Sequence, residues 1–339
     1  MIPFLLIGAL LLSWALTGLV RRYAVSADLL DRPNERSSHV VPTPRGGGMA
    51  IVASFLPLVL GLGLAGSIKP NLCIAAIGGG LLVAMLGFLD DRSSLPARWR
   101  FLGHAASAAW VLWWMGRIPQ VPIVGTLVDL SYAGSALCML YLVWMVNLFN
   151  FMDGIDGIAS VEAITTTLGG ALLWWLAGSG TGWLLALLFA GCVGGFLVWN
   201  WPPAKIFMGD AGSGFLGLMV ALLSLWCGQS TPHLFWAWFI LIGCFMVDGT
   251  TTLVRRVRRG DKFNEAHRSH AYQYAARHFG AHRPVTLAVA GINLLWLLPF
   301  AVAVALGWLD GVLGVGIAYA PLLWLAFRFK AGDRVAQEV

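Results

Sequence analysis

A series of apolar stretches, each long enough to cross a lipid bilayer, constrains this 339-residue chain most strongly. A spanning helix needs about 20 mostly apolar residues, and windows of that length give eleven predicted spans. Their approximate limits are 1–20, 46–67, 72–90, 101–118, 122–149, 159–178, 182–200, 212–228, 233–253, 285–307 and 311–328. Because helices satisfy their own backbone hydrogen bonds in lipid, the chain is predicted to be an all-α, polytopic membrane protein.

The positions of the Lys and Arg residues predict how these spans are oriented. If the N-terminus lies outside, all of the 22 Lys and Arg residues except Lys69 and Arg117 fall in inner loops or in the C-terminal segment. Cytoplasmic loops are enriched in basic residues, so we expect a periplasmic N-terminus and a cytoplasmic C-terminus. Arg21 and Arg22 follow the first apolar run and no basic residue precedes it. This order is the reverse of a secretory signal peptide and predicts an uncleaved first span.

Composition excludes several other classes of protein. Only 11% of the residues are charged, against about 25% in a soluble domain. The net charge of +6 does not indicate nucleic-acid binding, because the basic residues lie in short loops between apolar spans. The cysteines form neither a CxxC pair nor a Cys/His cluster, so neither a disulfide framework nor a zinc site is expected. We interpret all five as buried small apolar residues: Cys73, Cys138, Cys192, Cys227 and Cys244.

In this topology the polar clusters fall on the inner face. They lie at 28–45, 90–100, 147–157, 205–213 and 255–283. One elaborated face is typical of an enzyme that works at the cytoplasmic membrane surface. A transporter would more often carry ionisable groups near the middle of its spans, and the best candidate for such a group is Asp248.

Two amides and two carboxylates recur at every third position in one stretch: Asn147, Asn150, Asp153 and Asp156. Residues three apart on a helix share a face, and the glycines at 154 and 157 permit close approach of a ligand to the backbone. Mg²⁺ is commonly bound through one or two carboxylates together with substrate phosphates. The stretch therefore predicts a polar site for a divalent cation at the membrane surface; the alternative is a helix end capped by Asn and Asp.

Four further residues bear the kinds of side chain that such a site needs. Arg45 precedes three glycines at the start of a span, where helix N–H groups favour anions, although a flexible linker would look the same. Asp90 and Asp91 end a span as adjacent carboxylates, which repel each other unless a cation intervenes; the alternative is a solvated helix end. Asp210 lies just after a glycine and before the next span, and is the third candidate metal ligand.

The last two candidates lie in the later inner loops. Phe207 could stack on a nucleobase or serve as an interfacial anchor. His267 and His270 are three residues apart and are expected to share a helix face; contact with a diphosphate is favoured over zinc, because no third ligand is clustered with them. The arginines at 255–259 also suit anionic lipid headgroups, at about 1 kcal/mol for each basic residue.

Five motifs in this order resemble the polyprenyl-phosphate N-acetylhexosamine-1-phosphate transferases of glycosyltransferase family 4. This family includes the undecaprenyl-phosphate GlcNAc-1-phosphate transferases and the phospho-MurNAc-pentapeptide translocases. The resemblance runs from Pro33 to about His270 and is specific because the motifs occur together. The motifs are Pro42-Thr43-Pro44-Arg45-Gly46-Gly47, Asp90-Asp91, Asn147-x-x-Asn150-x-x-Asp153-Gly154-x-Asp156-Gly157, Phe207-Met208-Gly209-Asp210-x-Gly212-Ser213 and the pair His267 and His270.

The resemblance implies a reaction. A phosphate oxygen of undecaprenyl phosphate would attack the β-phosphorus of a UDP-N-acetylhexosamine, which yields a polyprenyl-diphosphate sugar and UMP. The implied cofactor is Mg²⁺, with Mn²⁺ as an alternative. Asp210 would be a metal ligand. Asp90 and Asp91 would help to hold the metal and would orient or deprotonate the lipid phosphate.

The resemblance also implies how the donor is bound. Asn150, Asp153 and Asp156 would form the nucleotide side of the site, together with Asn147. Phe207 would stack on uracil. The two histidines, His267 and His270, would contact the diphosphate.

Two departures separate the chain from the peptidoglycan branch of the family. That branch has three adjacent histidines where this chain reads His267-Arg268-Ser269-His270, and a lysine where this chain has Ser94. The stretch Asn34-Glu35-Arg36-Ser37-Ser38-His39 is closer to the branch that initiates O-antigen and teichoic acid, whose donors include UDP-GlcNAc, UDP-FucNAc and UDP-QuiNAc. Transfer of phospho-MurNAc-pentapeptide to the lipid is the weaker alternative.

The expectation for the whole chain follows. Residues 1–330 would form a single transmembrane catalytic domain and residues 331–339 a short cytoplasmic tail. The protein would lie in the bacterial inner membrane with its active site on the cytoplasmic face, where it would start O-antigen or another cell-surface polysaccharide. A homodimer is among the expected assemblies. The rival readings are a lipid or sugar transporter and a lipid diphosphate hydrolase.

Overall fold

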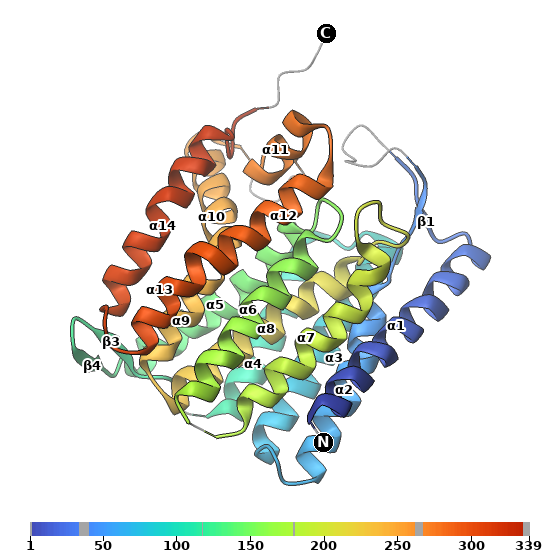
Figure 1. The fold of residues 1–339 in the computed structure, drawn as a ribbon. Coiled ribbons are helices and arrows are strands. Elements are labelled where there is room, and N and C mark those ends of the chain that lie inside the picture. The colour runs from blue at the N-terminus through green and yellow to red at the C-terminus, as the bar shows by residue number, and fades with distance from the viewer. Residues whose placement is uncertain (1, 34–40, 117, 179, 262–266, 335–339) are drawn as a thin grey trace.

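The computed structural model describes residues 2–33, 41–116, 118–178, 180–261 and 267–334. These residues form a bundle of helices in which the start of the first helix and the end of the last lie at opposite ends (Figure 1). The helices are α1 (Ile2–Ser26), α2 (Gly48–Leu64), α3 (Pro70–Ser93), α4 (Ala97–Met115), α5 (Ser131–Met152), α6 (Ile158–Leu176), α7 (Gly182–Asn200), α8 (Asp210–Ser230), α9 (His233–Leu241), α10 (Gly243–Arg258), α11 (Ala271–Phe279), α12 (His282–Ile292), α13 (Leu298–Ala305) and α14 (Gly311–Arg328), with the π-helical turn η1 (Asn293–Leu297) between α12 and α13.

The all-α, multi-pass architecture predicted from the apolar runs is confirmed. Each predicted span coincides with a helix or with a run of consecutive helices: the ninth is α9 and α10, bent by 72°, and the tenth is α12, η1 and α13. Within the described residues, seven helices are long and apolar enough to cross a membrane, and the bent pair would make an eighth. The number of crossings and their orientation stay predictions.

One predicted span begins too early. The prediction placed its start at residue 122, but β3 (Val121–Ile123) and β4 (Thr126–Val128) form an antiparallel hairpin there, and α5 starts only at Ser131. Pro122 has no N–H for a helix to use, and Gly125 takes φ +76° in the turn. The apolar run from residue 122 therefore contains a β-turn before the helix begins. A second short pair, β1 (Leu30–Asp31) with β2 (Thr43–Pro44), lies before α2.

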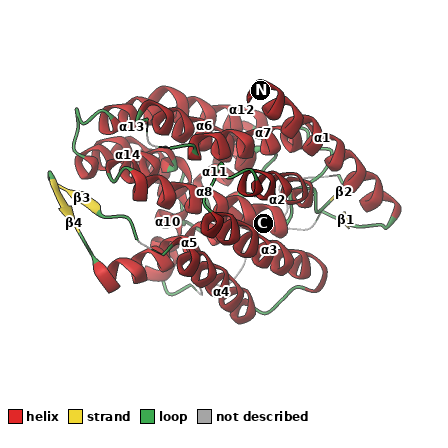
Figure 2. Cartoon of the chain, turned by 90° about the horizontal axis from the view of Figure 1, so that it is seen from below, coloured by secondary structure: helices red, strands yellow, loops and turns green. Residues whose placement is uncertain are grey.

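Helix α8 lies in the middle of the bundle, surrounded by α2, α3, α5, α6, α7 and α9 (Figure 2). Almost all of its residues are buried, whereas α1 lies at the edge. Two glycines let neighbouring helices reach its first turn. A Cβ on Gly48 of α2 would lie 2.3 Å from Gly212 Cα, and a Cβ on Gly87 of α3 would lie 2.4 Å from the Ala211 nitrogen. The ends of α2 and α3 are thereby held against the start of α8.

The segment after α14 packs against the end of α10. Ala331 is fully buried, and the N–H of Gly332 donates to the carbonyl of Ser269 over 2.6 Å. Arg255 of α10 donates to the Ala331 carbonyl over 2.5 Å. The first residues of the predicted tail are therefore docked beside the loop that contains His267.

Candidate active site

Asp91 joins the end of α3 to the start of α8. Its carboxylate accepts hydrogen bonds from the N–H groups of Asp210, over 3.0 Å, and Ala211, over 3.5 Å. Gly209 makes this approach possible: it has φ +78°, and a Cβ there would lie 2.6 Å from Asp91 Oδ2. A carboxylate at a helix N-terminus satisfies otherwise unpaired N–H groups and the positive end of the helix dipole. Asp91 therefore sets the position of Asp210.

Arg45 lies between two of the predicted metal ligands. One of its guanidinium nitrogens is 2.6 Å from Asp91 Oδ1 and 3.1 Å from Asp210 Oδ1. The loop that carries Arg45 is fixed by backbone hydrogen bonds with the loop before α8, from Gly47 N–H to the Phe207 carbonyl and from Phe207 N–H to the Pro44 carbonyl. Burial lowers the pKa of Arg45, but the charges of Asp91 and Asp210 outweigh it and the pKa is raised.

Asp90 points to different partners from those of Asp91. Its Oδ2 is 3.0 Å from Arg100 Nη1, and its Oδ1 accepts from the Leu95 N–H over 2.6 Å. The adjacent carboxylates thus face two arginines, one from the loop before α2 and one from α4.

A small pocket connects Asp90 with Asp210. It is lined in part by Asn147, Asn150 and His104. His104 Nδ1 is buried and has no hydrogen-bond partner among the residues that the structure describes. His104 could not be singled out from the sequence, because a lone histidine within an apolar run carries no motif.

The stretch from 147 to 157 does not form one helical face as predicted. Helix α5 ends at Met152, so only Asn147 and Asn150 share a face, while Asp153 and Asp156 lie in the loop that follows. Asn150 donates to Ser213 Oγ of α8 over 3.4 Å. Burial, and then the negative charge of Asp210, raise the pKa of Asp153 well above its usual value. Asp153 therefore belongs to the carboxylate cluster around the start of α8.

Asp156 is held by structural partners. Its Oδ2 is 3.2 Å from His282 Nδ1 and accepts from the Ala204 N–H over 3.0 Å. Its backbone carbonyl accepts from Thr286 Oγ1 over 2.9 Å. These contacts attach the loop after α5 to α12 and to the loop before α8.

His267 and His270 lie together, but not on one helix face as predicted, because α11 begins only after His270. Their rings stack with centroids 5.0 Å apart. Asp248 is 3.3 Å from His270 Nδ1 and accepts from the N–H groups of Ala271 and Tyr272, each over 3.0 Å. Burial, followed by the charges of His270 and Arg256, lowers the pKa of His267 to about 3.

Asp248 therefore caps α11 and orients a histidine. This is a different role from the mid-span transport group that it would supply in the rival reading.

Tyr272 links the histidine pair to the carboxylate cluster, and the sequence analysis missed it. Its hydroxyl donates to the Phe151 carbonyl over 3.0 Å, and its ring stacks on His270 with centroids 5.6 Å apart. It also lies close enough to Asp153 for the two groups to interact electrostatically. A Cβ on Gly154 would lie 2.1 Å from the Tyr272 hydroxyl, so Gly154 makes room for this contact.

The donor groups suit a hard divalent cation that also uses substrate oxygens. Among the described residues, no three His, Cys, Asp or Glu side chains already converge as a complete metal site. Asp91 and Asp210 do converge on one positive group, the Arg45 guanidinium. Two carboxylates completed by phosphate oxygens are a usual way to hold Mg²⁺, so these residues fit that ion.

Phe207 lies in the loop that adjoins Arg45, where it is partly buried. The stretch from Asn34 to His39, which distinguished the branches of the family, lies outside the described residues.

Comparisons with known proteins identify the family of the chain. The model of a family described as "Glycosyl transferase family 4" matches residues 73–228. The chain is 30% identical over 294 residues to the probable undecaprenyl-phosphate N-acetylglucosaminyl 1-phosphate transferase of Bacillus subtilis (strain 168), with 86% of this chain and 81% of that protein covered. It is 29% identical over 376 residues to the decaprenyl-phosphate N-acetylglucosaminephosphotransferase of Mycolicibacterium smegmatis, with 97% and 89% covered.

A phospho-N-acetylmuramoyl-pentapeptide-transferase of Gloeothece citriformis is 32% identical over a shorter region of 230 residues, which covers 63% of this chain and 60% of that protein. The family match, the two longer alignments and the five motifs agree. The chain is a multi-pass membrane protein that belongs to glycosyl transferase family 4, the polyprenyl-phosphate N-acetylhexosamine-1-phosphate transferases.

Proposed function

We propose that this protein transfers N-acetylglucosamine 1-phosphate from UDP-N-acetylglucosamine to undecaprenyl phosphate and releases UMP. The observation that carries the proposal is the contact of Arg45 with both Asp91 and Asp210 at the N-terminus of α8. The relatives that align along most of the chain are named as transferases of this sugar phosphate, which favours GlcNAc over the other N-acetylhexosamines. The lipid-linked product would start a cell-surface polysaccharide.

The acceptor, undecaprenyl phosphate, does not need a general base to become a nucleophile. A phosphate monoester has a second pKa near 6, so the lipid phosphate is mostly a dianion at neutral pH. Asp90 is engaged by Arg100 and the Leu95 N–H, and Asp91 by Arg45 and the first N–H groups of α8. We therefore assign these carboxylates to holding cations and positioning α8 rather than to removing a proton.

Two positive features would receive the donor diphosphate. The Arg45 guanidinium has donors that can bind phosphate oxygens in a bidentate manner, and the divalent cation is the second. Mg²⁺, held by Asp91 and Asp210 with Asp90 nearby, would neutralise the diphosphate and the departing UMP. Mn²⁺ would be the alternative cation.

The remaining residues would bind and orient the donor. Asn147 and Asn150 face the small pocket beside Asp210, where their amides could hydrogen bond to the nucleotide sugar. Phe207 would stack on uracil. With its lowered pKa, His267 is neutral at physiological pH and would contact the diphosphate as a hydrogen-bonding group, beside His270. The site would lie on the cytoplasmic face of the inner membrane, where UDP-sugars are available.

The test uses the purified protein in detergent with undecaprenyl phosphate and Mg²⁺. The donors are UDP-GlcNAc, UDP-FucNAc, UDP-QuiNAc and UDP-MurNAc-pentapeptide, and UMP is measured. We expect UMP from UDP-GlcNAc only when the lipid acceptor is present, and its loss with EDTA. UMP from another donor alone would correct the sugar. UMP without the acceptor would favour a hydrolase, and no UMP from folded protein would favour the transporter.

A further inference from the structure

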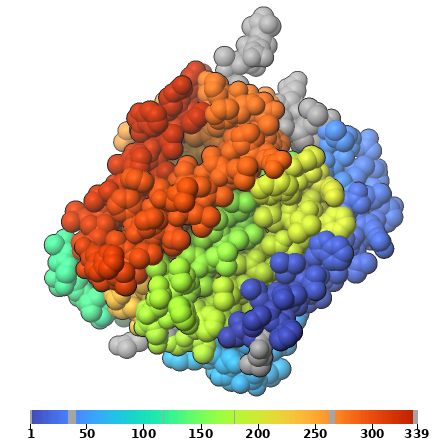
Figure 3. All heavy atoms as spheres, viewed as in Figure 1, coloured from blue at the N-terminus to red at the C-terminus, as the bar shows by residue number. Residues whose placement is uncertain are grey.

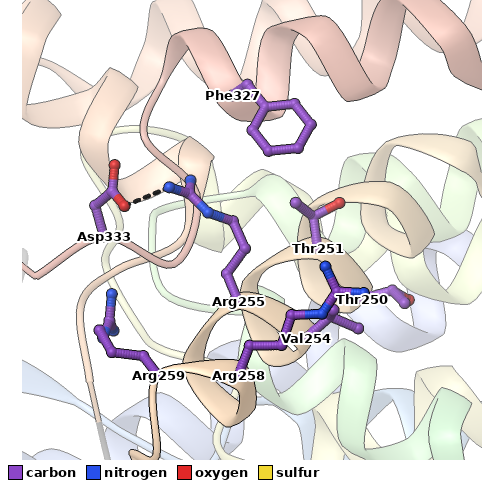
Figure 4. A pocket seen from close by; sticks show the side chains of 8 residues that line it. All are labelled: Thr250, Thr251, Val254, Arg255, Arg258, Arg259, Phe327 and Asp333. Carbon is purple, nitrogen blue, oxygen red and sulfur yellow. Dashed lines mark hydrogen bonds and ion pairs between the residues drawn. The ribbon is translucent and has the colours of Figure 1, made fainter.

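A second pocket lies at the end of α10. It has a volume of about 650 Å³ and is bounded by the end of α10, the end of α14 and the segment after α14 (Figure 4). The residues that line it come from α10, α14 and the segment after α14, and none of them belongs to the proposed active site. The pocket is therefore separate from the proposed active site.

Positive charge dominates the pocket. Figure 4 shows three arginines leaving the same end of α10: Arg255, Arg258 and Arg259. The carboxylate in the lining is Asp333, which lies 2.5 Å from Arg255. Arg259 pairs with Asp261 outside the pocket. Arg258 is exposed and forms no ion pair with any residue that the structure describes. The pocket therefore has an excess of positive charge that favours an anion.

The apolar wall of the pocket is open. It consists of Phe327 on α14, which is 58% exposed, and Val254 on α10, which is 41% exposed. The Arg255 guanidinium carbon lies 5.4 Å from the centroid of the Phe327 ring, so the charged and apolar walls meet. Helix α14 is long and apolar enough to cross a membrane and ends at Arg328, which places the basic end of the pocket at the level of lipid headgroups.

We propose that this pocket binds an anionic diacyl phospholipid of the surrounding membrane, distinct from the polyprenyl phosphate substrate. Arg258 and Arg255 bind the phosphodiester, and an acyl chain lies over Phe327 and Val254. Charge complementarity selects an anionic headgroup, and the exposed apolar wall selects a lipid over a soluble anion. The proposal concerns binding alone and does not depend on which sugar the enzyme transfers.

The experiment measures lipid retention by native mass spectrometry of the full chain in detergent. Phosphatidylglycerol and phosphatidylcholine are offered at equal concentration. We expect preferential retention of phosphatidylglycerol. Arg258→Gln should reduce that retention about fivefold, the effect of removing one favourable basic contact with an anionic lipid, and Phe327→Ala should also reduce it. Arg22→Gln is the matched control, because Arg22 is an exposed arginine on α1, and it should bind as the wild type does.

Competition distinguishes the sources of the phosphate group. Retention of phosphatidylglycerol should persist when inorganic phosphate or undecaprenyl phosphate is added at the same concentration. Displacement by inorganic phosphate would assign the pocket to a soluble anion, and displacement by undecaprenyl phosphate would assign it to the reacting lipid; either result would overturn the proposal. So would equal retention of the two phospholipids, or wild-type binding by a monodisperse Arg258→Gln protein.

Discussion

Arg45 makes the contacts on which most of the proposed chemistry depends, because it bridges Asp91 and Asp210. Replacing it with Gln leaves two nearby carboxylates without their shared cation and removes a phosphate donor. We expect Arg45→Gln to lower kcat/KM by about 100-fold or more, as losses of a single charge-stabilising donor do. Arg45→Lys keeps the charge but not the planar pair of donors. Its kcat/KM should therefore lie between those of the wild type and of Arg45→Gln. Initial rates of UMP release measure both.

The control for Arg45 is Arg22→Gln, which removes an exposed arginine of α1 and should stay within twofold of the wild type. Near-normal turnover by a folded Arg45→Gln protein would contradict the assignment of the site.

His267 gives a prediction about pH. Its pKa is about 3 in the folded protein and about 6.5 in an unfolded chain, so below pH 6.5 the unfolded state takes up a proton more readily. Folding stability is therefore intact above pH 6.5 and is lost as the pH falls toward 3. We expect the thermal unfolding midpoint in detergent to fall between pH 7.5 and pH 5, and to fall less in His267→Gln. If the unfolding midpoints of the two proteins changed with pH in parallel, burial would not lower the pKa of His267.

The partners of individual side chains could not be predicted from the sequence. Asp90 and Asp91 are indistinguishable as a motif, yet one pairs with Arg100 and the other with Arg45. That choice depends on which residues distant in sequence the fold brings near each carboxylate. The motifs identified Arg45, Asp91 and Asp210 as candidates, and the structure brings these three side chains together. Tyr272 and His104 were missed because a lone aromatic residue or histidine in apolar surroundings has no distinguishing pattern.

At the scale of elements, a close contact between Gly154 and Tyr272 contributes to the docking of α11, beside the cap that Asp248 provides. A Cβ on Gly154 would lie 2.1 Å from the Tyr272 hydroxyl, so Gly154→Ala should push α11 away and destabilise the protein by about 1–3 kcal/mol. Tyr272→Phe loses the hydrogen bonds of the hydroxyl, which include the one to Phe151, at about 1 kcal/mol each. Because Phe removes the clashing oxygen, Gly154→Ala should cost less in the Tyr272→Phe background than in the wild type. Unfolding in denaturant measures the cycle.

Gly61→Ala on α2 is the matched control for that cycle, since a Cβ there meets nothing within 4 Å. Strictly additive effects of the two substitutions would mean that Gly154 does not act through Tyr272.

The apolar runs predicted where helices lie but not how they end or bend. The break between Leu241 and Gly243, the hairpin at Val121–Val128 and the end of α5 at Met152 lie in stretches that remain apolar or periodic. Hydropathy does not detect these breaks and ends, because it indicates burial in lipid or protein and not the direction of the backbone. Because α5 ends at Met152, Asp153 and Asp156 lie in the loop after it and not on the helical face predicted for them.

For the whole molecule, the distribution of basic residues predicts an odd number of crossings and a cytoplasmic site. The start of α1 and the end of α14 lie at opposite ends of the bundle (Figure 3 shows the same face with its atoms filled). In a cysteine-free background, a membrane-impermeant maleimide should label Ser230→Cys in intact spheroplasts, and Ser94→Cys only after permeabilisation. Both positions are exposed. Labelling of Ser94→Cys from outside would reverse the orientation.

The most direct measurement follows the β-phosphorus. UDP-GlcNAc labelled at its β-phosphate is incubated with undecaprenyl phosphate, Mg²⁺ and either the wild type or Asp91→Asn, which retains shape but loses charge at the start of α8. We expect the label to enter the lipid fraction with one unlabelled UMP for each lipid product, and folded Asp91→Asn to lose most of this transfer. Label released as water-soluble phosphate or sugar phosphate, or equal transfer by Asp91→Asn, would contradict the account.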